Sequence, residues 1–175
     1  MIKPIALTTI LVLACQASLS EPEDRKLNYS LYMSILVEEV KQNQPQLPFA
    51  AMIIDNHSGR ILCKATNKGT PSPIDHAELE VIKICNDRFR GAIRWNRTTL
   101  ISTAEPCPMC QGGASWANIS TVVYGTSIPT LVANGWKQIN LRAYTVAKQS
   151  TFNRTRIIGG VLQDQTDALF IRTKR

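Results

Sequence analysis

The sequence predicts an α/β fold, a three-layer α/β/α sandwich built around a mixed five-stranded sheet. Three observations support this prediction. Short runs rich in β-branched residues alternate with segments of helical hydrophobic spacing along most of the chain. A hairpin signal joins the first two runs. A helical crossover separates the last two runs, which implies that the fourth and fifth strands are parallel and that helices cover the sheet.

The first half of the chain is predicted to supply a helix, a hairpin and a second helix. Leu27, Leu31 and Ile35 recur at helical spacing, and the polar, proline-containing stretch 42–48 ends that pattern. Asn56-His-Ser-Gly59 indicates a turn between two apolar runs. The expected elements are a helix over residues 24–42, strands over 49–54 and 60–65, and a helix over 76–88.

The second half alternates strands and helices. Thr99-Leu-Ile-Ser102 is a strand that runs directly into a helix carrying two cysteines, with Pro106 as a favoured start residue. The expected elements after it are a strand over 121–125, crossover helices within 129–150, a fifth strand over 157–162 and a short helix from 165. The cysteine pair would lie at the start of one helix and an upstream histidine at the start of another. We expect these residues to converge at one end of the sheet.

The first residues have the layout of a secretory signal peptide. Lys3 gives a basic start, residues 5–14 are mostly apolar but too short to span a membrane, and small residues precede the charged run 21–26. We expect cleavage after Ala17, so that residues 1–17 are the signal peptide. Val12-Leu-Ala-Cys15 also resembles a bacterial lipobox, and a lipoprotein anchored through Cys15 is one alternative. A cytosolic protein with an apolar start is the other.

The mature chain is expected to be exported, to the periplasm or the outside, as one domain over residues 18–175. About 155 residues are enough for a single core, and no low-complexity linker or repeat divides them. Cys63 and Cys85 fall in apolar surroundings on a strand and a helix, so we expect two buried free thiols, with a disulfide as the alternative in an oxidising compartment. Five sequons, which matter only in a eukaryotic secretory pathway, are at Asn28, Asn56, Asn96, Asn118 and Asn153.

The charge is moderately basic. The formal balance is +7, or +6 once Lys3 leaves with the leader. This excess suits a solvated surface as well as it suits nucleic acid or phosphate-bearing ligands, and we favour the solvated surface. Two local clusters stand out, Arg88, Arg90, Arg94 and Arg97 in the first and Arg172, Lys174 and Arg175 in the second.

A set of metal ligands is the most informative feature of the chain. His76 precedes Pro106-Cys107-Pro-Met-Cys110 by about thirty residues. Cysteines three positions apart project from one face of a helix. Together with one histidine they form a Cys₂His set, and three protein ligands are typical of a catalytic zinc site with an open fourth position. We therefore expect one zinc ion per chain. A redox pair at Cys107 and Cys110 is the alternative.

Glu78 is the candidate acid/base. It lies two residues from His76, so a carboxylate beside the metal can move the protons of a hydrolytic reaction. The alternative interpretation is structural, because Asp75-His-Ala-Glu78 also resembles a helix N-cap followed by a capping glutamate. The combination of spacing and residue types favours catalysis.

The stretch Thr103-Ala-Glu-Pro-Cys-Pro-Met-Cys-Gln-Gly-Gly-Ala-Ser-Trp116-Ala-Asn-Ile resembles the cytidine deaminase-like superfamily, within it the branch of guanine and tRNA adenosine deaminases. The resemblance implies a zinc hydrolase and homodimeric subunits. It implies that His76, Cys107 and Cys110 bind zinc and that Glu78 shuttles protons. It also implies substrate-binding positions, for which a turn, core or packing role is the alternative: Asn67, Phe49, Ala77 and Trp116.

The expected function is hydrolytic release of ammonia from a nucleobase, nucleoside or nucleotide. A purine is favoured because Trp116 offers a flat apolar wall. Guanine deaminases carry an acidic pocket residue after the fourth strand, whereas residues 125–133 contain no acid, which departs from that activity. The alternatives are a deaminase acting on a base in RNA, less favoured for an exported protein, and a zinc-stabilised interaction protein without turnover.

Overall fold

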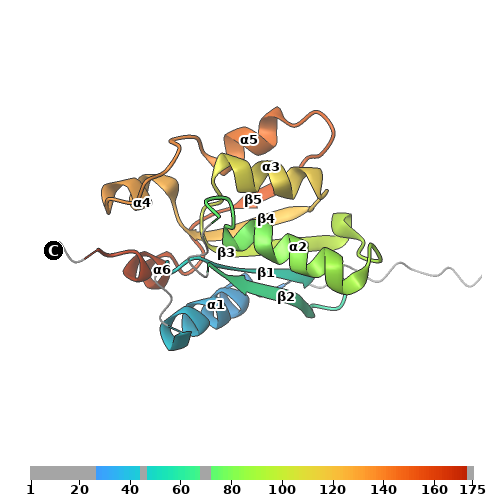
Figure 1. The fold of residues 1–175 in the computed structure, drawn as a ribbon, viewed down its shortest axis with the longest axis horizontal. Coiled ribbons are helices and arrows are strands. Elements are labelled where there is room, and N and C mark those ends of the chain that lie inside the picture. The colour runs from blue at the N-terminus through green and yellow to red at the C-terminus, as the bar shows by residue number, and fades with distance from the viewer. Residues whose placement is uncertain (1–26, 44–46, 68–71, 173–175) are drawn as a thin grey trace, which may run out of the picture.

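The computed structural model describes residues 27–43, 47–67 and 72–172. Helices and strands alternate along this part of the chain (Figure 1). Their bounds are α1 (Tyr29–Asn43), β1 (Ala50–Asp55), β2 (Ile61–Thr66), α2 (Ala77–Phe89), η1 (Trp95–Arg97), β3 (Thr98–Ala104), α3 (Pro108–Trp116), β4 (Thr121–Thr126), α4 (Ile128–Ala133), α5 (Ala143–Gln149), β5 (Arg156–Ile158) and α6 (Gln163–Leu169).

The five strands form one mixed sheet in the order β2-β1-β3-β4-β5. β1 is antiparallel to β2 and to β3, whereas β3, β4 and β5 run parallel to one another. The turn at 56–59 joins β1 and β2, with Gly59 in the left-handed region at φ 71°. These findings confirm the predicted mixed sheet and the parallel fourth and fifth strands.

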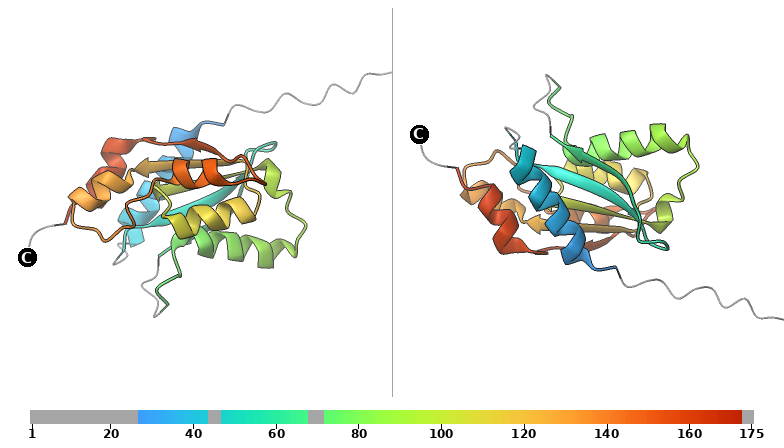
Figure 2. Two further views of the ribbon diagram at one scale, coloured as in Figure 1. Left: turned by 90° about the horizontal axis from the view of Figure 1, so that it is seen from above. Right: turned by 90° about the horizontal axis from the view of Figure 1, so that it is seen from below.

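Helices cover both faces of the sheet. Figure 2 shows α2, α3 and α5 on one side and α1 and α6 on the other. Alternate residues of β1 divide between the two cores: Ala51 and Ile53 pack in the cluster that contains Val81 of α2, and Met52 packs in the cluster that contains Leu36 of α1. Burial on both faces explains why β1 reads as a continuous apolar run rather than an alternating one. The predicted α/β/α sandwich is confirmed.

The fifth strand is shorter than predicted. β5 ends at Ile158 because the next residue, Gly159, lies against the ring of Tyr124. A Cβ atom at Gly159 would come within 2.4 Å of that ring. Gly160 and Leu162 then adopt positive φ angles, 76° and 50°, which turn the chain into α6. The predicted extension of this strand to residue 162 was therefore wrong.

Cys63 of β2 and Cys85 of α2 form a disulfide, with their Cα atoms 5.7 Å apart. The expectation of two free thiols was wrong, because the packing of α2 on β2 brings two buried positions 22 residues apart within bonding range. The bond ties the helix that begins at His76 to the edge strand of the sheet.

The N-terminal predictions fall largely outside the described residues. The signal peptide over 1–17, the lipobox at Cys15 and the start of the predicted helix at residue 24 all lie there, and so do Lys174 and Arg175. Among the helices that the structure describes, none has the length and apolar character needed to cross a membrane.

Candidate active site

Three ligand atoms meet where two helices begin. His76 is the N-cap of α2 and Cys107 the N-cap of α3, while Cys110 lies in the first turn of α3. His76 Nδ1 lies 3.6 Å from Cys107 Sγ and 3.4 Å from Cys110 Sγ, and the two sulfur atoms are 3.5 Å apart. β3 runs directly into the loop before α3, so the sheet fixes where both cysteines lie. Pro108, rather than Pro106, is the first residue of this helix.

The geometry of these atoms fits zinc. Two sulfurs bound at about 2.3 Å to a tetrahedral zinc are about 3.8 Å apart, close to the separation found here. A hydrogen bond from Cys110, together with His76, lowers the pKa of Cys107 to about 4, while that bond and burial raise the pKa of Cys110. These opposite shifts favour a thiolate at Cys107 and a thiol at Cys110, and zinc, which binds the thiolate form, would displace the thiol proton. His76, Cys107 and Cys110 could together hold one zinc ion.

Glu78 lies in the first turn of α2 with a side chain that is 3% exposed. Its Oε1 accepts a hydrogen bond of 3.1 Å from Ser102 Oγ on β3. Burial raises the pKa of its carboxyl group, which favours the protonated form relative to an exposed glutamate. The N-cap of α2 is His76 rather than Asp75, and Glu78 faces the sheet, so the structure does not support the capping-box interpretation.

A cavity of about 270 Å³ opens onto His76, Glu78 and Cys107. Its walls come from six separate segments of the chain. The lining residues are Leu47, Phe49, Asn67, His76, Glu78, Glu105, Cys107, Gly135, Trp136, Lys137, Gln138 and Arg172. Phe49 and Asn67 therefore lie where the family resemblance placed them, and their contacts with a substrate stay a prediction.

The aromatic wall of this cavity is Trp136, not Trp116. Trp136 packs edge-on against Phe49 at 5.3 Å between ring centroids and against Phe170 at 5.8 Å, and its Nε1 donates a 2.8 Å hydrogen bond to Phe170 O. The guanidinium of Arg172 lies 4.1 Å from its ring centroid.

Two predicted substrate-binding residues lie elsewhere. Trp116 is the last residue of α3, is 78% exposed, and stacks on Phe152 instead of lining the cavity. The side chain of Ala77 is buried in the core between α2 and the sheet. The α3 helix carries Trp116 away from the cysteines and the Ala77 side chain packs in the core, so neither side chain lines this cavity, and a contact of either residue with a substrate stays a prediction.

Residues 135–138 and Arg172 were missed by sequence analysis. Residues 135–138 follow α4 in an irregular segment, and Arg172 follows α6. A tryptophan flanked by Gly135 and Lys137 in a polar loop is the one signal that pointed here, since aromatic side chains in loops are often exposed for binding.

The first basic cluster does not border the cavity. α2 begins at the metal ligands and spans 13 residues, a length of about 20 Å. Arg88 lies in its last turn, where Nη1 donates to Leu62 O, and Arg90 is its C-cap. The cluster is therefore a surface feature at the opposite end of the helix.

Comparison with known proteins identifies the family of this chain and several relatives. Residues 26–126 match the family model described as the cytidine and deoxycytidylate deaminase zinc-binding region. The chain is 29% identical over 141 residues to the tRNA-specific adenosine deaminase of Bacillus subtilis, covering 77% of this chain and 81% of that protein. It is 38% identical over 80 residues to the guanine deaminase of the same organism, covering 44% of this chain and 49% of that one. The solved structure of a guanine deaminase from Nitrosomonas europaea superposes with a TM-score of 0.70 at 23% identity, covering 85% of this chain and 86% of the other.

Proposed function

The chain belongs to the family defined by the cytidine and deoxycytidylate deaminase zinc-binding region. We propose that its substrate is a free purine base or nucleoside. It is a zinc-dependent nucleobase or nucleoside deaminase, a hydrolase of carbon–nitrogen bonds in cyclic amidines. The observation that carries the proposal is the convergence of His76, Cys107 and Cys110 within 4.8 Å of one another, beside Glu78, at the base of an open cavity.

Zinc held by this ligand set would lower the pKa of a bound water to about 7 and so supply hydroxide at neutral pH. Glu78 would accept the proton of the attacking water as oxygen bonds to the ring carbon. It would then give that proton to the ring nitrogen, take the proton of the newly formed hydroxyl group and pass it to the amino group, so that the carbon–nitrogen bond breaks, a carbonyl remains and ammonia leaves. Ser102, which donates to Glu78 Oε1, would hold the carboxylate toward the cavity.

The substrate is the finer part of the proposal. A small planar base fits a cavity lined by Phe49 and Trp136, and aromatic rings offer such ligands a large apolar contact. The guanine deaminase relative supports a purine. Gln138 supplies to the cavity lining an amide that both donates and accepts hydrogen bonds.

The test is ammonia release from a panel of substrates by purified protein loaded with zinc. The panel holds adenine, guanine and cytosine, their nucleosides and nucleotides, a tRNA and a single-stranded DNA. We expect a purine base or nucleoside to give the highest kcat/KM. A pyrimidine or a polynucleotide with the highest value would refute the purine proposal, and no ammonia from any substrate would refute turnover itself.

A base within RNA is the second candidate substrate, and one observation favours it. Lys137 and Arg172 place two cationic side chains at the cavity wall, where a phosphate could be bound. Such binding would weaken steeply as salt is raised, since it releases counterions from the polynucleotide. Affinity for tRNA that is independent of salt would exclude this candidate.

We infer that the protein assembles as a homodimer through Trp116 and Phe152. These side chains are 78% and 55% exposed, and their ring centroids lie 4.5 Å apart. Adjacent exposed aromatic side chains are enriched at subunit interfaces. Sedimentation should give a dimer for the wild type and a shift toward monomer for Trp116→Ser, and an unchanged mass for this variant would locate the interface elsewhere.

We also propose that the protein is exported. The Cys63–Cys85 disulfide supports this proposal, because disulfides persist in oxidising compartments. When the full-length chain is expressed, cell fractionation should find the protein outside the cytosol, with a mass that reports removal of residues 1–17 or a lipid on Cys15. Recovery in the cytosol, with both cysteines reduced, would refute export.

A further inference from the structure

Four neighbouring residues of the cavity lining, 135–138, lie in one segment, residues 127–143, which connects β4 to α5. We call it the wall segment. It contains the six-residue helix α4, the irregular stretch with Trp136 and Gln138, and the N-terminus of α5. Helices this short are not stable by themselves, so contacts with the rest of the protein must hold the segment in place.

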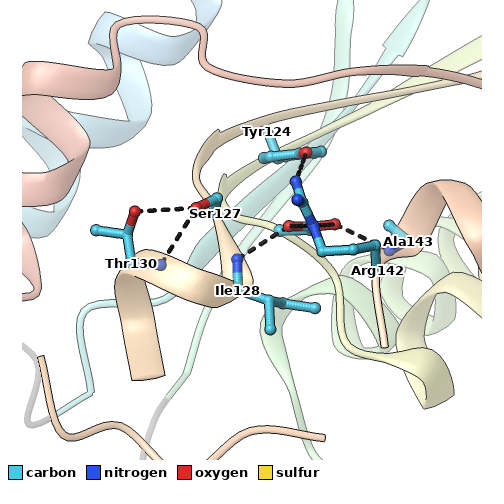
Figure 3. A network of polar contacts seen from close by, with 7 residues as sticks. Tyr124, Ser127, Ile128, Thr130, Arg142 and Ala143 are labelled. Atoms are coloured by element: carbon cyan, nitrogen blue, oxygen red, sulfur yellow. Dashed lines mark hydrogen bonds and ion pairs between the residues drawn. The ribbon is translucent and has the colours of Figure 1, made fainter. Parts of the chain in front are cut away.

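One buried carboxylate contacts both ends of the wall segment. Glu105 Oε2 accepts a 2.9 Å hydrogen bond from Ile128 N at the start of α4, and Oε1 accepts one of 2.9 Å from Ala143 N at the start of α5. Arg142 Nε donates to both oxygens at 2.8 Å. Figure 3 shows Ile128, Arg142 and Ala143 around this carboxylate. A negative charge is favourable at a helix N-terminus, and the Glu105 carboxylate lies at the N-termini of both α4 and α5.

The same carboxylate is rigidly connected to the metal ligands. Glu105 lies two residues before Cys107, in the loop between β3 and α3, and its side chain is fully buried. Arg142 also donates from Nη2 to Tyr124 Oη at 2.8 Å, which anchors the ion pair to β4. The distance from the metal site to the wall segment is therefore set through Glu105.

We propose that Glu105 and Arg142 are positioning residues that hold the wall segment, and with it Trp136 and Gln138, at the correct distance from the metal centre. Arg142 does not line the cavity, so it acts on the substrate only through the wall. Removing it leaves a buried carboxylate without its counter-charge and frees one end of the segment. The kinetic part of this proposal rests on the proposed deaminase function, whereas its structural part does not.

The structural test uses the fluorescence of Trp136. In a Trp95→Phe, Trp116→Phe background, Trp136 is the one tryptophan left in the 175-residue chain. We expect Arg142→Met to increase acrylamide quenching of Trp136, and Arg142→Lys to restore part of the protection, because lysine keeps the charge but lacks the separate nitrogens that bind Glu105 and Tyr124. The matched control is Arg156→Met, which removes an exposed arginine from β5. Equal quenching in Arg142→Met and the control would overturn the proposal, whether or not the protein is active.

The kinetic test uses the best substrate of the panel. We expect Arg142→Met to raise KM about tenfold or more with kcat little changed and zinc still at one per chain, since small displacements of binding groups weaken substrate binding strongly. Loss of zinc without a change in quenching would overturn the proposal, because the pair would then support the metal loop and not the wall. A higher KM without a change in quenching would overturn it too. If Arg142→Met does not fold, Arg142→Lys is compared with the parent in the same two assays, with smaller changes expected in the same directions.

Discussion

The inner and outer halves of the cavity are built in different ways. The inner half consists of His76, Glu78 and Cys107, with the buried Cys110 in contact with His76 and Cys107, and these residues come from two short motifs, each at the start of a helix that packs on the sheet. The outer half consists of residues 135–138 with Phe49, Asn67 and Arg172, which come from several segments without regular structure. The inner half is fixed by the fold itself, whereas the outer half depends on a few side-chain contacts.

This difference assigns different tasks to the two halves. Chemistry needs ligand and proton-transfer atoms within a few tenths of an ångström, which helix starts packed on a sheet can provide. Substrate choice needs a surface that can change without disturbing those atoms, and loops on a rigid scaffold provide it. Mutations in the inner half should therefore abolish turnover, and mutations in the outer half should change affinity and selectivity.

Cys107→Ala should have the largest effect, because it breaks the metal site. We expect zinc content to fall far below one per chain, ammonia release to fall to background, and the thermal midpoint to drop, since metal binding contributes to folding. A chelator should lower the thermal midpoint of the wild type and leave that of the variant unchanged. Full zinc occupancy in Cys107→Ala, measured by elemental analysis, would contradict the ligand assignment.

Glu78→Gln should lower kcat by roughly 10²- to 10⁴-fold while zinc stays bound, because the amide keeps the shape of the side chain but cannot transfer protons. The matched control is Glu80→Gln. Glu80 lies two residues further along α2 and does not line the cavity. This control should retain wild-type turnover. If Glu78→Gln behaves like its control, Glu78 has a structural role only.

Trp136→Ala tests the outer half. Base–aromatic contacts are worth about 1–3 kcal/mol, so we expect kcat/KM to fall roughly ten- to hundredfold, mainly through KM, with zinc retained. Trp136→Phe should recover most of the loss. Trp116→Ala should leave KM close to the wild-type value, because Trp116 does not line the cavity. A larger KM effect from Trp116→Ala than from Trp136→Ala would reverse the assignment of the wall.

The same division explains what the sequence could predict. The inner half could be predicted because its signal lies in two short motifs: the residue types and spacing of His76 and of Pro106–Cys110, each placed at a helix start, together predict a metal site. Trp136 could not be distinguished from Trp116 in this way, since its position depends on the hydrogen bond to Phe170, 34 residues away. The contact between Cys63 and Cys85 likewise depends on how α2 packs on β2, and spacing along the chain does not specify it.

The disulfide offers the finest test of how the inner half is fixed, because it holds α2 on β2 without touching the cavity. The double variant Cys63→Ala, Cys85→Ala removes a cross-link between residues 22 positions apart. By the loop-entropy model this should lower the free energy of unfolding by about 3 kcal/mol. Denaturant titration measures this loss, and the reduced wild type should match the variant. We expect zinc content, kcat and KM to stay near wild type, since packing of Val81 and Ala77 against the sheet still orients His76 and Glu78. A parallel loss of zinc would show that the cross-link, and not the packing of α2, sets the position of the inner half.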